Sequence, residues 1–160
     1  MGLTYARWDL ARKTADNLAA DYSSPPIPVV EIAEQNGVDV VFAEFGAHSD
    51  AVAGFCDFED KQIVVNDADS FGRKMFTIAH ELGHWVLHRG FFEREPGKYA
   101  VLPRFQKPEK NPFEQEANCF AAELLVPRHL LLPVKHAGVA TLAEIFGVSR
   151  EMMEFRLKNV

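Results

Sequence analysis

The sequence predicts a helix-rich α+β fold in which a small three-stranded antiparallel sheet packs on one long helix. Three observations lead to this prediction. The 160 residues contain no internal repeat or linker, which fits one domain over 1–160. Three short segments rich in Val and Phe follow one another, and apolar residues recur at helical spacing through most of the rest. We expect a core over about residues 25–130 and a helical extension over 131–160.

Two helices are expected before the strands. Apolar residues at helical spacing predict the first over residues 4–22, and Pro25 and Pro26 end it. A second, shorter helix begins at Pro28, since proline suits the first turn of a helix, and it ends at Gly37.

The three expected strands are short and rich in β-branched and aromatic side chains. They cover residues 38–45, 51–58 and 61–66. Glu59 and Asp60, between the last two segments, are typical of a hairpin turn. The hairpin is the reason for expecting an antiparallel sheet.

Residues 71–88 predict the central helix, because apolar side chains recur along one of its sides. His80 and His84 share another side, four residues apart, so both imidazoles can converge on one metal ion. Glu81 lies beside them, placed to take a proton from water activated by the metal. These residues form an HExxH motif, which predicts a zinc site with Glu81 as the catalytic base.

His88 continues the four-residue spacing but lies about 12 Å along the helix axis from His80. It is therefore not expected to share the metal ion while the helix stays regular. We expect His88 to cap the C-terminus of the helix, with a direct role in the active site as the alternative. The following segment, 89–111, is expected to be a long loop because it contains four residues that interrupt regular structure: Pro96, Gly97, Pro103 and Pro108.

A catalytic zinc ion needs a third protein ligand and an open position for water. The next helix supplies candidates: Asn111 is a suitable N-cap, proline follows it, and Pro127 ends the helical pattern. On a helical wheel, Glu114 and Asn118 share a face that small neighbouring alanines allow to pack closely. Glu116 and Glu123 point the opposite way and are not expected to bind the metal.

We expect Glu114 to be the third ligand. Asn118, one turn further on, would form a hydrogen bond to a histidine or to this carboxylate. The alternative for Glu114 is a purely local role, as the partner of Asn111 in a capping box.

Together, residues 73–88 (RKMFTIAHELGHWVLH) and 114–127 (EQEANCFAAELLVP) resemble the ImmA/IrrE family of metallopeptidases. Weaker similarity in the early Pro-Val helix and in residues 63–66 extends the resemblance over most of 25–130. It implies a zincin-like fold of the gluzincin type, with one zinc ion on His80, His84 and Glu114. It also implies a zinc-dependent endopeptidase that cleaves a helix-turn-helix transcriptional repressor encoded nearby, in a mobile element, a phage or a stress response.

Peptide hydrolysis at such a site also needs a donor to the oxyanion, and Tyr99 and His88 are the candidates. We expect the substrate to add a strand at the sheet edge formed by residues 51–58. A different possibility also follows from the resemblance. The protein would then be a non-catalytic or partner-activated component of a toxin–antitoxin-like pair and would act by protein–protein binding.

The C-terminal residues 141–157 predict two short helices joined at Gly147, an arrangement like a helix-turn-helix. Thr141 with Glu144 is expected to cap the first helix and Ser149 the second. We do not expect direct nucleic-acid binding, because acids balance bases in this segment and the formal net charge of the chain is −6. No segment predicts a membrane span or signal peptide, so a cytoplasmic location is expected, while the oligomeric state is left open.

Overall fold

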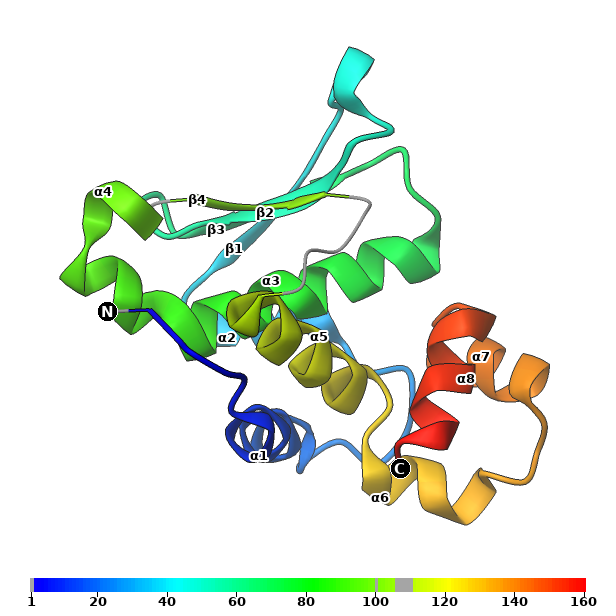
Figure 1. Cartoon of the computed structure of the whole chain (residues 1–160). Helices are drawn as coiled ribbons and strands as arrows, with labels where there is room; N and C mark the ends of the chain where they lie inside the picture. The colour runs from blue at the N-terminus through cyan, green and yellow to red at the C-terminus, as the bar shows by residue number, and fades with distance from the viewer. Residues whose placement is uncertain (1, 100, 106–110) are drawn as a thin grey trace.

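The computed structural model describes residues 2–99, 101–105 and 111–160 and confirms the α+β class (Figure 1). The helices in chain order are α1 (Trp8–Ala19), α2 (Val29–Gln35), α3 (Phe71–Arg94), α4 (Pro96–Tyr99), α5 (Pro112–Leu125), α6 (Arg128–Leu131), α7 (Val139–Phe146) and α8 (Arg150–Lys158). The strands are β1 (Asp39–Ala43), β2 (Val52–Asp57), β3 (Gln62–Asn66) and β4 (Val101–Phe105). Two 3-10 turns, η1 (Gly46–His48) and η2 (Leu132–Val134), complete the described elements.

The sheet differs from the expected three antiparallel strands, because it is mixed and has a fourth strand. Its order is β1-β3-β2-β4, with β1 parallel to β3 and β2 antiparallel to both of its neighbours. The hairpin of β2 and β3 places β3 beside β1, and this makes the pair parallel. β4 lies in the segment expected to be a loop. Pro103 is tolerated in it because β4 is an edge strand, where a missing N–H breaks no inner ladder.

The central helix α3 is longer than expected and ends at Arg94 rather than at His88. Ser70 caps its first turn by accepting a hydrogen bond from the Arg73 N–H at 3.4 Å. Gly90 does not end the helix, since a glycine within a helix costs only about 1 kcal/mol relative to alanine. Residues 89–94 are therefore helical, and the described part of the expected long loop contains the end of α3, α4 and β4.

The sheet and the helices stack in layers, with α3 between the sheet and α5. Figure 1 shows the sheet on one side of this helix and α5 on the other, with α1 beyond α5, and these elements contact one another in that order. Fully buried side chains fill the space between them, including Ile78 and Leu82 from α3 and Phe120 from α5. Three buried alanines on α1, four residues apart, allow it to approach α5 closely: Ala11, Ala15 and Ala19.

The C-terminal helices α7 and α8 pack beside the end of α5. Gly147 joins them in the left-handed conformation, at φ 69°, and Ser149 caps α8 as expected. The cap expected from Thr141 and Glu144 was wrong, because α7 begins two residues earlier, at Val139. No helix among the described residues is long and apolar enough to cross a membrane.

Candidate metal centre

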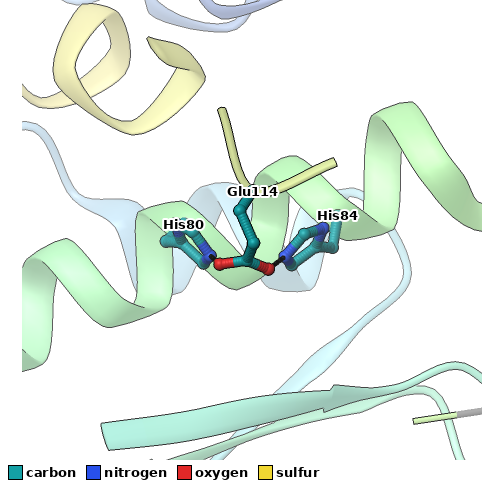
Figure 2. Close-up of side chains that lie close together, drawn as sticks. All are labelled: His80, His84 and Glu114. Atoms are coloured by element: carbon teal, nitrogen blue, oxygen red, sulfur yellow. Dashed lines mark hydrogen bonds and ion pairs between the residues drawn. The ribbon is translucent and has the colours of Figure 1, made fainter. Parts of the chain in front are cut away.

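The two histidines of the HExxH motif and the glutamate of the next long helix lie together (Figure 2). His80 Nε2 is 3.0 Å from Glu114 Oε2, and His84 Nε2 is 2.9 Å from Glu114 Oε1. The three ligand atoms all lie within 4.8 Å of one another. Ligand atoms around a tetrahedral zinc ion are about 3.3 Å apart, given bonds of about 2 Å. The donor set therefore fits one metal ion.

Helix geometry places these side chains. His80 and His84, four residues apart on α3, present their rings on one side, and both side chains are fully buried. Glu114 comes from the first turn of α5, and its side chain is 14% exposed. The candidate centre is thus buried on the α3 side and reaches solvent beside Glu114.

Close contact between α3 and α5 sets the distance between the histidines and the glutamate. Gly83 faces α5, and a Cβ atom there would lie 3.0 Å from Phe120 Cδ1 and 3.3 Å from Ala117 Cα. A larger residue would separate the two helices. The glycine of the HExxH segment therefore has a packing role as well as its place in the motif.

Glu114 takes part in the N-terminal cap of α5 only through its backbone. Asn111 Oδ1 accepts a hydrogen bond from the Glu114 N–H at 2.9 Å and so caps α5. The Glu114 side chain instead turns toward the two histidines. Burial raises the pKa of Glu114, but hydrogen bonds from His80 and His84 outweigh it and hold the pKa well below its usual range. Glu114 is therefore a carboxylate, as a metal ligand must be.

Asn118 lies where a supporting residue was expected. Its Oδ1 is 2.8 Å from His80 Nδ1. An amide oxygen only accepts, so Nδ1 donates this hydrogen bond, and Nε2, which faces Glu114, is the nitrogen left to bind a metal ion. The amide thus orients the ring with Nε2 toward the candidate site.

His88 has neither of the two roles expected for it. It does not cap α3, which continues for six more residues. It is not placed to donate to an oxyanion either, because both ring nitrogens are engaged: Nδ1 is 2.8 Å from His84 Nδ1, and Nε2 is 2.9 Å from Glu116 Oε1. Burial, chiefly, lowers the pKa of His88 to about 4, so the ring is neutral near pH 7.

Glu116 and Arg7 were not identified from the sequence as part of this centre. Glu116 is not part of the group that could hold a metal ion, as the helical wheel indicated, and it is fully buried. The Arg7 side chain and backbone N–H bind it at 2.7–2.9 Å. Burial raises the pKa of Glu116, but hydrogen bonds from His88 and Arg7 outweigh this and lower it to about 2. In the sequence, the four-residue repeat of histidine at 80, 84 and 88 was the one indication that further residues adjoin this site.

Glu81 is fully buried on α3 next to His80. Burial raises the pKa of the Cys56 thiol on β2, and the negative charge of Glu81 adds to this rise. This interaction indicates that Glu81 lies toward the side of α3 that packs on β2. The side chain of Tyr99, the other candidate oxyanion donor, lies outside the described residues.

A groove of about 690 Å³ borders the candidate centre. Phe76 and Asn118, which adjoin His80, line one part of it, and Met152 and Phe155 of α8 line another. The sheet offers no free edge at residues 51–58, contrary to expectation, because β2 pairs with β3 on one side and with β4 on the other. The expected addition of a substrate strand to β2 was therefore wrong.

The sequence and the fold are similar to those of known proteins. The family model of the IrrE N-terminal-like domain (Peptidase_M78) matches residues 33–158. The chain is 29% identical over 119 residues to immunity region protein 2 of Bacillus phage phi105, which is described as uncharacterized; the match covers 68% of this chain and 70% of the phage protein. A solved structure of a Mycobacterium tuberculosis transcriptional regulator shares the fold, with a TM-score of 0.64 and 15% identity. That match covers 91% of this chain but only 45% of the regulator.

Proposed function

The chain belongs to the IrrE N-terminal-like peptidase family, and from this premise we propose that it is a zinc-dependent endopeptidase acting on a transcriptional repressor. The observation that carries the proposal is the convergence of His80, His84 and Glu114 beside a buried Glu81. Three protein ligands leave a fourth position open, which is the pattern of catalytic zinc sites, whereas structural sites are closed by four. Family membership and a donor set that suits a metal ion both support a metallopeptidase.

The chemistry divides between the metal and the residues around it. A zinc ion bound here would supply Lewis acidity, which polarises a peptide carbonyl and makes water a nucleophile near neutral pH. Glu81 would accept the proton of the attacking water and then donate it to the leaving amine.

The neighbouring side chains would hold this arrangement in place. Asn118 fixes the tautomer of His80, and Glu114 adds a negative charge that offsets the positive charge of the ion. We propose that the substrate segment lies in the groove beside Asn118 and Phe76, with a side chain directed toward α8. Both of these residues contact His80, and this contact is the reason for placing the substrate in this groove.

The choice of a repressor as substrate rests on the similarity to a phage immunity-region protein. A repressor is present in the cytoplasm, where we also place this chain. The helical segment 131–160 would serve substrate contact rather than DNA binding, because Phe155 on α8 is 58% exposed and lines the groove.

The test is cleavage of the repressor encoded next to this gene. Zinc-loaded protein and its Glu81→Gln variant are each incubated with that repressor, and the products are measured by mass spectrometry. We expect cleavage at one or a few peptide bonds by the wild type and none by the variant, with equal zinc content in both. Equal cleavage by the variant would contradict the role of Glu81. Stable binding without cleavage by either would favour the non-catalytic alternative.

A further inference from the structure

We propose that His88, Glu116 and Arg7 form a positioning relay that fixes the tautomer of His84 and thereby strengthens metal binding. The inference rests on the proposed metal-dependent function and adds three residues to it. The relay is the chain of contacts from Arg7 through Glu116 to His88. It ends at the ring nitrogen of His84 that faces away from Glu114.

The relay is continuous, and its members are buried except for Arg7 at its outer end, whose side chain is 36% exposed. His84 and Glu116 are fully buried, and His88 is 1% exposed. Each step is a hydrogen bond of 2.7–2.9 Å, and Arg7 makes three of them to Glu116, through its backbone N–H, Nε and Nη2. A buried polar group left without a hydrogen-bond partner would lower the stability of the protein. The side chains are therefore held in the one arrangement that satisfies all of them.

The positions of the protons give the hydrogen bonds of the relay one direction. A metal ion at Nε2 of His84 needs the lone pair of that nitrogen, so the proton of the neutral ring must be on Nδ1. That N–H donates to His88 Nδ1, which must then be the acceptor. The single proton of His88 is left on Nε2 and donates to Glu116 Oε1. Arg7 donates to both oxygens of Glu116, and every atom has a matching partner.

The two metal-binding histidines are therefore supported differently. His80 is held by a neutral amide from α5, whereas His84 is connected through a second imidazole to a carboxylate. A carboxylate behind an imidazole makes the ring a stronger metal ligand and fixes its orientation. Arg7 precedes α1 and lies outside residues 33–158, so the N-terminal segment completes a centre built within the family domain.

The test compares His88→Ala with His88→Gln. A glutamine amide can accept from His84 with its oxygen and donate to Glu116 with its nitrogen, so it can replace both hydrogen bonds, whereas alanine can replace neither. Zinc affinity is measured by competition with a chromophoric chelator, and the visible bands of bound Co²⁺ report the ligand geometry. We expect zinc affinity about 10–100-fold weaker in His88→Ala, with altered Co²⁺ bands, and affinity within about threefold of wild type in His88→Gln.

Two further variants separate positioning from a loss of stability. Arg7→Ala should weaken zinc binding in the same direction but less than His88→Ala. Leu131→Ala removes a fully buried side chain of α6 outside the relay, and it should leave zinc affinity unchanged while lowering the resistance to urea.

The outcomes distinguish the relay from the proposed function. Wild-type zinc affinity in His88→Ala, or an equal loss of zinc affinity in His88→Ala and His88→Gln, would overturn the relay but not the proposal that the protein binds zinc. The expected affinities without cleavage by the wild type would support the relay and contradict the peptidase proposal. A wild-type protein that binds no zinc would overturn both.

Discussion

Replacement of Gly83 by alanine tests whether the contact between α3 and α5 sets the metal centre. The added Cβ would lie 3.0 Å from Phe120 Cδ1 and 3.3 Å from Ala117 Cα. Phe120 is fully buried and the second atom is backbone, so neither can move without shifting α5. Overpacking of this kind costs about 1–3 kcal/mol, against a gain of about 1 kcal/mol in helix propensity. We therefore expect a net loss of about 1 kcal/mol in the free energy of unfolding.

The same shift would move Glu114, because it lies on α5. We expect weaker zinc binding in Gly83→Ala, measured by chelator competition beside urea unfolding. Gly90→Ala is the matched control on the same helix, since its Cβ would meet only Arg94 Nη1, at 3.8 Å, among the described atoms. It should be stabilised by up to about 1 kcal/mol and bind zinc normally. A Gly83→Ala variant that behaves like this control would refute the reasoning.

Two further predictions concern Arg156, which joins α8 to the end of α5. Its buried guanidinium lies 3.2 Å from Glu123 Oε1, and its Nε donates to the Val126 carbonyl at 2.9 Å. Arg156→Met should lower the free energy of unfolding by about 3 kcal/mol in urea titrations, and adding Glu123→Leu should recover part of the loss; no loss in the single variant would refute the role of the pair. Burial raises the pKa of Glu123 from its ordinary 4.5 to about 7, so its contribution to stability is full below pH 4.5 and is lost as the pH rises through 7. As the pH rises from 5 to 8, the stability of Glu123→Gln should therefore increase relative to that of wild type. Thermal melts that show the same difference between the two proteins at every pH would contradict this.

The local parts of the fold could be predicted from the sequence. The α+β class, the start of the helix that carries His80 and His84, and the helix that begins after Asn111 all follow from spacing and capping. The same spacing arguments selected Glu114, which the structure places beside both histidines. Whether these residues bind zinc, and whether residues 131–160 form an extension to a core over 25–130, stay predictions.

The features that depend on distant segments were missed. The parallel pairing of β1 with β3 depends on how a hairpin docks on an earlier strand, and no local pattern reports it. The prolines of residues 89–111 suggested a loop, but an edge strand tolerates Pro103. Glu116 was placed correctly relative to the candidate metal ligands, yet a helical wheel of α5 alone does not show that Arg7 and His88 bind its carboxylate.

The most direct test of the central claim is a crystal structure of the zinc-loaded protein, with diffraction measured at the zinc absorption edge. We predict one anomalous peak per chain, about 2.0–2.2 Å from Nε2 of His80, Nε2 of His84 and an oxygen of Glu114, with a fourth position open to solvent. A zinc ion held by other residues, or closed off by a fourth protein ligand, would contradict the account.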